Sequence, residues 1–375
     1  MSQLRLRKPG IILLLIWTQF AFSKNAPLTN KTVSLFQAQS TYATGNKPNE
    51  IAKGDFNGNG KLDLAITHFT SNTVSILQGS GNGTFTVKST YKTGINPQGI
   101  VVGDFNGDSI LDLAIVNKGS NTVSLLLNNG VGDFLTQSTY ATGSQPESIV
   151  IGDFTGDGLL DLVLTNKGSN TISILSGNGD GTFQKQLMYA TGTHPHGIAL
   201  GDFNGDGKLD LAITNSGSNT VSILLNNGNG TFRTQSTYAA GKNPTGIGAG
   251  DFNKNGKLDL AVLNSESNTV SILLGKGDGT FQSQTNYATG ANPYGIIVGD
   301  FNKDGNLDLA ITNSGGNTIS ILLGNGDGTF RSQLTYVTGL HPEGIVAGDF
   351  NGDEKLDLAI TNVANNTVSI LLSTQ

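Results

Sequence analysis

The chain has 375 residues, 52 of them glycine, and contains no cysteine, so disulfide bonds cannot hold its fold together. Its formal net charge is -6, and it contains no basic run of the kind that binds nucleic acid. The glycine lacks the Gly-X-Y period of collagen, and only 13% of residues are charged. This composition favours many short strands joined by turns.

The first residues have the pattern of an export signal. Arg5, Arg7 and Lys8 precede an apolar run over residues 11–22, and small residues follow at 21–23. We expect a signal peptide over residues 1–23 and a short linker over 24–29, which predicts a secreted protein, extracellular or periplasmic. The apolar run is shorter than the roughly 20 residues that span a bilayer. No later stretch is apolar enough to span, so we expect no membrane-spanning segment.

One acidic stretch then recurs along the rest of the chain. In its fourth copy, residues 201–211 read Gly-Asp-Phe-Asn-Gly-Asp-Gly-Lys-Leu-Asp-Leu. Each copy begins 49 residues after the one before it, and the first aspartates of the seven copies are Asp55, Asp104, Asp153, Asp202, Asp251, Asp300 and Asp349. A constant period of this length is typical of a propeller, because calcium-binding β-helix repeats are much shorter.

Each repeat predicts four antiparallel strands. In the fourth repeat, large and small residues alternate over 197–201, and apolar residues alternate again from Leu209. A polar turn leads to a third strand over 220–225, and an Asn-Gly hairpin leads to a mostly polar outer strand over 232–238. Four strands that grade from apolar to polar are typical of a propeller blade. We therefore predict an all-β, seven-bladed β-propeller over residues 30–375.

The two ends of the chain predict how the ring closes. The seventh repeat stops at residues 371–375, after its third strand, and residues 36–45 match residues 85–94 one period later. The N-terminal strand should therefore complete the last blade and remove an open sheet edge. Strand order then places the acidic loops and Asn-Gly hairpins on one face of the ring. The crossings between blades and the Asn-Ser-Gly turns fall on the other face.

The acidic loops have the composition of a calcium site. Numbered from the first aspartate, positions one, three, five and nine offer side-chain oxygens and position seven a backbone carbonyl, and calcium prefers six to eight oxygens. Position twelve is apolar, as at Ile213, so the loop is not an EF-hand. The alternative is a tight turn without an ion, but two or three carboxylates in one loop repel each other unless a cation compensates them.

We expect up to seven calcium ions, with weaker sites in the second and seventh loops, where Ser109 and Glu354 replace the glycine of position six. The loops at Asp55 and Asp251 carry less charge because position five is asparagine. The predicted ligands, loop by loop, are Asp55, Asn57, Asn59, Lys61 and Asp63; Asp104, Asn106, Asp108 and Asp112; Asp153, Thr155, Asp157, Leu159 and Asp161; Asp202, Asn204, Asp206, Lys208 and Asp210; Asp251, Asn253, Asn255, Lys257 and Asp259; Asp300, Asn302, Asp304, Asn306 and Asp308; and Asp349, Asn351, Asp353 and Asp357.

This repeated stretch resembles the FG-GAP/VCBS repeats of calcium-binding β-propellers, a family that includes integrin α-subunit heads and some fungal lectins. The resemblance covers nearly the whole chain after the signal. It implies that ions brace the blades and that recognition occurs elsewhere on the ring. The family includes adhesion proteins, lectins and a few enzymes, so the resemblance does not settle the function.

A second set of residues varies between repeats whose other positions hardly change. The residue after the recurrent proline is polar in every repeat and differs in kind: Asn49, Gln98, Glu147, His196, Thr245, Tyr294 and Glu343. Because each enters the innermost strand, we expect these side chains to ring the mouth of the central channel. They are either a ligand-binding site or solvated loop residues under weak constraint.

These observations predict a monomeric binding or adhesion module for an extracellular protein or glycan. A multivalent lectin with sites between blades is the alternative, and recognition would then involve blade-edge residues such as Lys118 and Lys167. A polysaccharide-acting enzyme is a third possibility, although the sequence contains no catalytic motif that we recognise.

Overall fold

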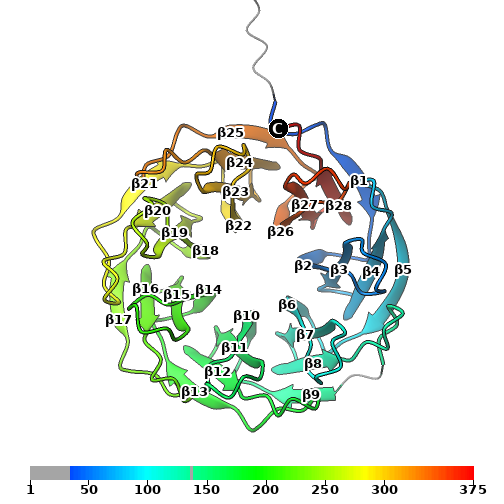
Figure 1. Ribbon diagram of the computed structural model, residues 1–375, viewed down its shortest axis with the longest axis horizontal. Helices are drawn as coiled ribbons and strands as arrows, with labels where there is room; N and C mark the ends of the chain where they lie inside the picture. The colour runs from blue at the N-terminus through cyan, green and yellow to red at the C-terminus, as the bar shows by residue number, and fades with distance from the viewer. Residues whose placement is uncertain (1–33, 136–137) are drawn as a thin grey trace, which may run out of the picture. The chain divides into compact units, whose positions relative to one another are not determined.

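The computed structural model describes residues 34–135 and 138–375. Residues Leu35–Gln375 form a compact unit of their own. The described residues contain no helix, and hence none that could cross a membrane. Their strands form seven separate four-stranded sheets, which surround a common axis (Figure 1). The predicted all-β, seven-bladed propeller is confirmed, whereas the predicted signal peptide and linker lie outside the described residues.

The two inner strands of each blade repeat with constant bounds. The innermost strands are β2 (Pro48–Gly54), β6 (Pro97–Gly103), β10 (Pro146–Gly152), β14 (Pro195–Gly201), β18 (Pro244–Gly250), β22 (Pro293–Gly299) and β26 (Pro342–Gly348). The second strands are β3 (Asp63–His68), β7 (Asp112–Asn117), β11 (Asp161–Asn166), β15 (Asp210–Asn215), β19 (Asp259–Asn264), β23 (Asp308–Asn313) and β27 (Asp357–Asn362).

The two outer strands vary more in length. The third strands are β4 (Thr73–Gly79), β8 (Thr122–Leu126), β12 (Thr171–Leu175), β16 (Thr220–Leu224), β20 (Thr269–Leu273), β24 (Thr318–Leu322) and β28 (Thr367–Leu371). The outermost strands are β1 (Ser40–Ala43), β5 (Phe85–Lys92), β9 (Ser138–Ala141), β13 (Leu187–Ala190), β17 (Ser236–Ala239), β21 (Thr285–Ala288) and β25 (Leu334–Val337).

The outer strand of the fourth repeat is shorter than its sequence predicts. Phe232 makes an isolated bridge to Asn226, and the regular strand begins only at Ser236. Arg233 still donates its backbone N–H to the Leu225 carbonyl at 2.8 Å. An edge strand tolerates this interruption because only one neighbouring strand depends on its hydrogen bonds.

The hydrophobic core lies between neighbouring blades rather than within one sheet. β15 is buried along its whole length, and its side chains alternate between the two faces of the sheet. Leu211 and Ile213 pack into the cluster shared with the third blade, whereas Ala212 packs into the cluster shared with the fifth. Phe203 of the acidic loop contacts Phe281 of the fifth blade, with ring centroids 5.8 Å apart. Each blade therefore depends on both of its neighbours.

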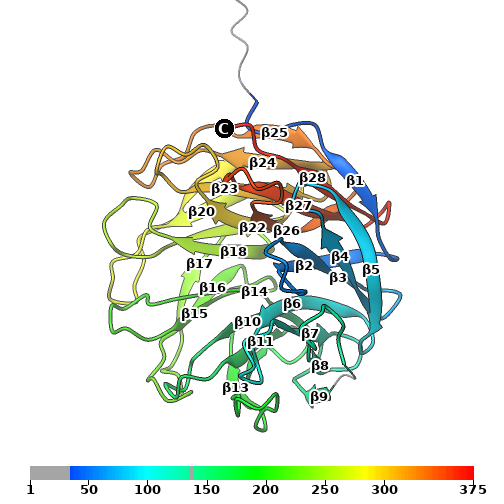
Figure 2. The ribbon, with the colours of Figure 1, turned by 45° about the vertical axis from the view of Figure 1, so that its right-hand side comes forward.

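The N-terminal strand closes the ring as the sequence predicts. β1 pairs antiparallel with β28, and the sheet order of the last blade is β1-β28-β27-β26 (Figures 1 and 2). Phe36 makes a bridge to Ser373 and packs edge-on against Tyr336, with centroids 5.5 Å apart. Phe36 is only 2% exposed, so the first described residues of the ring contribute to its core.

Hydrogen bonds confirm the two predicted faces. On one face, the hairpins of five blades donate a glycine N–H to the acidic loop of the preceding blade, as Gly230 does to the Phe154 carbonyl at 2.9 Å. On the other face, the polar turn meets the crossing into the next blade, because Asn170 Oδ1 accepts the His194 N–H at 2.8 Å. We call these the loop face and the crossing face.

Candidate functional site

The acidic loops fold around their own side chains. In the fourth loop, Asp202 accepts backbone N–H groups from Gly205 at 2.7 Å, Asp206 at 3.1 Å and Gly207 at 2.7 Å. Asn204 Oδ1 accepts the Asp206 N–H at 2.9 Å. The side chains of positions one, three and five therefore point toward the centre of the loop, where they organise its turn.

The aspartate of position nine is a buried structural residue in this geometry. Asp210 is 0% exposed; its Oδ2 accepts the Phe203 N–H at 3.1 Å, and its Oδ1 accepts the Asn226 N–H at 2.8 Å. The other six blades repeat the bond to the loop phenylalanine and the bond to the residue sixteen positions on. This carboxylate therefore ties the loop, the second strand and the hairpin together, a role that the sequence analysis did not anticipate.

The buried aspartates also report the local charge. Burial, together with the carboxylates at positions one and five of the same loop, raises the pKa of Asp112, Asp210 and Asp308 to about 6. In the first loop, where position five is Asn59, burial again raises the pKa of Asp63, and only Asp55 acts as a neighbouring acid. The loops therefore concentrate negative charge, and a loop with aspartate at position five carries one more carboxylate.

Two backbone positions in each loop require a left-handed conformation. Position six has φ of +66° at Ser109 and +60° at Glu354, where the other five loops have glycine. This is the strain that the sequence predicts for the second and seventh loops. Position four behaves in the same way, with φ of +55° at both Lys254 and Lys303. The sequence analysis did not identify this second requirement.

The donor atoms of the loops fit a hard cation, since they are all oxygens. In each loop, at least one other carboxylate lies close enough to raise the pKa of the aspartate at position nine. Residues 34–135 and 138–375 nevertheless contain no group of three or more His, Asp or Glu side chains placed to hold a metal. At position nine, both oxygens of Asp210 accept backbone N–H groups. Calcium binding at the predicted ligands remains a prediction.

The crossing face carries the second predicted site. All seven residues after the recurrent prolines occupy the second position of an innermost strand, and four of them, Asn49, Gln98, Glu147 and Thr245, are buried. Gln98, Glu147, His196 and Tyr294 line one cavity of about 160 Å³ at the ring centre. Asn49, Thr245 and Glu343 are not part of its lining; Thr245, for example, donates to the Pro293 carbonyl at 3.1 Å.

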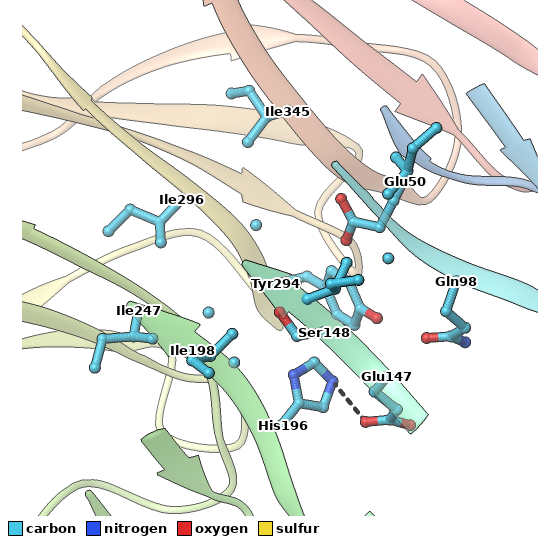
Figure 3. A pocket seen from close by; sticks show the side chains of 16 residues that line it. Glu50, Gln98, Glu147, Ser148, His196, Ile198, Ile247, Tyr294, Ile296 and Ile345 are labelled. Atoms are coloured by element: carbon cyan, nitrogen blue, oxygen red, sulfur yellow. Dashed lines mark ion pairs between the residues drawn. The ribbon is translucent and has the colours of Figure 1, made fainter. Parts of the chain in front are cut away.

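Glu147 is the most heavily partnered residue of the cavity. It is 5% exposed, and its Oε1 accepts hydrogen bonds from Lys118 and, at 3.2 Å, from Lys167. Its Oε2 lies 3.5 Å from Nε2 of His196 (Figure 3) but accepts no hydrogen bond. Lys118 and Lys167, which the sequence analysis names as blade-edge residues, thus both contact a residue of the channel cavity: Lys118 reaches it from the second blade, and Lys167 belongs to the same blade as Glu147.

The charges and the burial around Glu147 determine the protonation states of Glu147 and His196. Burial would raise the pKa of Glu147, but His196, Lys167 and Lys118 together lower it below its ordinary value. Burial lowers the pKa of His196, although Glu147 opposes that change. At neutral pH the pair is therefore an ionised glutamate beside a neutral imidazole, whose ring packs edge-on against Tyr294 with centroids 5.4 Å apart.

Glu343 forms a separate polar contact beside the cavity. It accepts the side-chain amide of Asn49 at 2.5 Å, and its Oε1 lies 3.2 Å from Nε2 of His341. The hydrogen bond to Glu343 raises the pKa of His341. An open hollow of about 540 Å³ adjoins His341 between the last blade and the first. Glu343 therefore links the channel mouth to the surface of the crossing face.

The sequence analysis missed Glu50, which also lines the cavity. It occupies the third position of its innermost strand, where the other repeats have glycine or, once, Ser148. Burial and the charge of Glu343 raise the pKa of Glu50 to about 8. The sequence does contain a signal for Glu50, because a glutamate replaces the glycine of most other repeats at this position. The signal lies one residue beyond the positions that directly follow the prolines.

The polar residues before the prolines have a conformational explanation. All seven have positive φ, from +51° at Lys47 and Asn243 to +57° at His341. Asparagine accepts this conformation more readily than most residues, and it appears here three times. His194 and His341 are thus held by backbone geometry, and nothing in their arrangement indicates a metal site.

Taken together, these features define a closed seven-bladed propeller with repeated acidic loops on one face and a polar cavity on the other. The FG-GAP-like repeat family matches residues 55–115, 104–164, 153–213, 202–262, 251–311 and 300–360, and the chain belongs to this family. A search of curated proteins finds no match.

Solved structures share the fold at low sequence identity. BBS1N in complex with ARL6DN is 13% identical, with a TM-score of 0.66, and the match covers 91% of this chain and 98% of that one. A catalytically inactive virginiamycin B lyase from Staphylococcus aureus, with quinupristin, is 16% identical, with a TM-score of 0.63 and coverage of 90% and 99%. An Agrocybe aegerita lectin that recognises non-reducing terminal N-acetylglucosamine is 18% identical, with a TM-score of 0.53 and coverage of 88% and 97%.

Proposed function

We propose that this protein is a secreted, calcium-stabilised propeller that binds a protein or glycan ligand at the channel mouth of its crossing face. The observation that carries the proposal is the convergence of Gln98, Glu147, His196 and Tyr294 on one cavity. They come from four blades whose sequences otherwise hardly differ. Convergent and chemically diverse groups on a rigid scaffold are what selective binding requires.

Calcium would serve stability in this proposal, not recognition. The side chains of positions one, three, five and nine and the carbonyl of position seven would hold one ion in each loop. Each ion would compensate carboxylates that lie close together in the interface between two blades. Because every loop has the same task, the loops offer little to distinguish one partner from another.

The test is a quadruple substitution of Glu147, His196, Tyr294 and Glu343 by alanine. A ligand is first found by a glycan array in calcium or by pull-down on extracellular surface material. We expect the quadruple variant to lose binding and to keep nearly the same calcium-bound melting temperature. A control variant with K276A and R331A, two exposed changes on hairpins of the loop face, should bind like the wild type. Normal binding by the quadruple variant would contradict the proposal.

A multivalent lectin with sites between blades is the second candidate. A hollow of about 200 Å³ between the outer strands of the second and third blades supports it, and its lining includes Tyr140, Gln184, Lys185 and Gln186. Aromatic and amide side chains of this kind are suited to sugar hydroxyl groups. This candidate gains if binding survives the quadruple change and is lost in a variant with K185A and Q186A.

A further inference from the structure

The chemical class of ligand can be inferred from the walls of the channel cavity, and this step rests on the proposed function. Glu50 is the first observation. A Cβ atom added at the matching Gly197 would lie 2.4 Å from the Thr245 carbonyl oxygen, and one at Gly295 would lie 2.4 Å from that of Glu343. The neighbouring blade therefore leaves room only for glycine at these positions. Glu50 departs from this rule and directs its carboxyl group toward the cavity (Figure 3).

The second observation is a buried acceptor that has no donor, Oε2 of Glu147. Oε2 of Glu147 accepts no hydrogen bond, and only 5% of the residue is exposed to solvent. Among the residues that the structure describes, no cation forms an ion pair with Glu50. Lys53, on the same strand, donates to the Ala347 carbonyl instead. Unpaired acceptors of this kind are costly unless a donor arrives with the ligand.

The third observation is the division of the cavity into two sides. Glu50, Gln98 and Glu147 lie on one side, and Ile198, Ile247 and Ile296 lie on the other (Figure 3). Tyr294 also contributes to the wall, with a hydroxyl group that can accept or donate a hydrogen bond. A ligand that matches both sides must carry hydrogen-bond donors and an apolar segment. An ammonium group provides three donors and no acceptor.

We propose that the cavity binds a primary ammonium group carried on an apolar chain, as in a lysine side chain. The ammonium group donates to Glu50 and to Oε2 of Glu147, and its methylene groups lie against the isoleucines. Lys118 and Lys167 already neutralise part of the Glu147 charge, so Glu50 supplies the charge that pairs with the ligand. His196 stays neutral and adds no opposing charge.

The protonation of Glu50 gives this binding a pH dependence. Glu50 is half-buried, lies near Glu343 and Tyr294, and lines the cavity with Glu147 and His196. Its partial burial and the charge of Glu343 raise its pKa to about 8, so it holds a proton in the free protein at pH 7. Binding of an ammonium group requires the ionised form, so one proton leaves for each ligand bound. The affinity should therefore rise about tenfold per pH unit between pH 6 and 7 and level off above pH 8.

The experiment is calorimetric titration of the full chain with Nα-acetyl-lysine N-methylamide. Nα-acetyl-norleucine N-methylamide lacks the amine and is the ligand control, and glucosamine presents the same ammonium group on a polar ring. We expect only the lysine compound to bind, with release of about one proton at pH 7. The isosteric E50Q variant should lose at least tenfold in affinity at pH 8.5 and lose the pH dependence. The control E266Q, an exposed change on the same face, should behave like the wild type.

Three results would overturn the inference even if the lysine compound binds. These are equal binding of the norleucine compound, tighter binding of glucosamine, and unchanged affinity of E50Q. A lysine compound that fails to bind at pH 8.5 also contradicts it, but leaves the proposed function intact as long as the quadruple alanine variant loses its macromolecular ligand. The proposed function fails separately, when that quadruple variant binds as the wild type does.

Discussion

The two faces of this ring differ in how strictly their repeats agree. On the loop face, all seven blades keep aspartate at positions one and nine, and every Asp at position nine accepts the same two backbone N–H groups, as Asp210 does. On the crossing face, the second and third positions of the innermost strands hold Glu50, Glu147, His196 and Tyr294, and of these four only Glu147 has an identical counterpart, Glu343. The loop face repeats the same hydrogen-bonded aspartates in every blade, whereas the crossing face brings different side chains together around one cavity.

The comparison teaches where repetition constrains a residue and where it does not. A loop-face residue contacts its own blade and the next, so the same contact must work at every interface. The channel cavity exists once, so its wall needs no symmetry. Departures from the repeat on the crossing face are therefore more informative about function than the repeated motif itself.

The largest expected effect is on the ring that supports both faces. Deletion of residues 31–45 removes β1 and the buried residues Leu35 and Phe36, and leaves β28 with an unpaired edge. We expect a loss of about 5 kcal/mol or more, because loss of a buried phenylalanine alone costs about 3–5 kcal/mol. Size-exclusion chromatography and thermal melting should show unfolded or oligomeric protein. A stable monomer would contradict both ring closure and the count of seven blades.

Calcium should act on the loop face and bring the second largest effect. An ion that binds only the folded state adds about 2.7 kcal/mol per site at a hundredfold excess over its Kd. We expect excess chelator to lower the melting temperature of the wild type. A melting temperature that does not respond to chelator would remove calcium from the proposal.

Two matched variants sharpen this test. D202A should destabilise more than D55A in calcium, because the fourth loop has one more carboxylate. In chelator the difference should shrink to about 1 kcal/mol, the worth of one hydrogen bond, since Asp202 accepts three backbone N–H groups and Asp55 accepts two. A difference that is the same with and without chelator would assign it to the turn alone.

The fold was predictable because its signals are local and repeated, whereas parts of the site were not. The 49-residue period and the match between the two chain ends were sufficient to predict seven blades and a closed ring. The spacing of Asp210 is equally compatible with a calcium ligand and with a buried acceptor of backbone N–H groups. The two roles are distinguished only in three dimensions, where the third strand and its hairpin bring the Asn226 N–H next to Oδ1 of Asp210. The contact of Glu147 with Lys118 joins two blades, and its contact with Lys167 lies within one blade. Both depend on side chains that are not shared by all repeats, so the 49-residue period does not predict them.

Glu50 provides a smaller effect, confined to the crossing face. Its pKa is about 8 in the folded protein and near 4.5 when unfolded, so between these values the folded state holds a proton that the unfolded state has lost. Stability from this residue therefore falls as the pH rises from about 4.5 to 8. E50Q should match the wild type at pH 5 and exceed it by roughly 2 kcal/mol at pH 9, after allowance for solvent screening. Urea unfolding at both pH values checks this, and E266Q should show no such change.

The smallest expected effect concerns a departure from the repeat that has no evident binding role. His68 is 0% exposed, and neither of its ring nitrogens has a hydrogen-bond partner. The other six blades have asparagine there; in the fourth, Asn215 donates to Thr220 at 3.2 Å and to Ser222 at 2.8 Å. H68N should restore these bonds to Thr73 and Ser75 and stabilise the protein by about 1 kcal/mol at pH 7.5.

The gain from H68N should grow in acid. Burial lowers the pKa of His68 to about 4, so the unfolded state takes up a proton below pH 6.5 that the folded state refuses, and stability falls as the pH drops from 6.5 to 4. H68N removes this loss, and the reverse change N215H should introduce it into the fourth blade. Urea midpoints at pH 7.5 and pH 5 measure both variants. If H68N were the less stable protein at both pH values, the ring of His68 would be contributing packing that asparagine cannot replace.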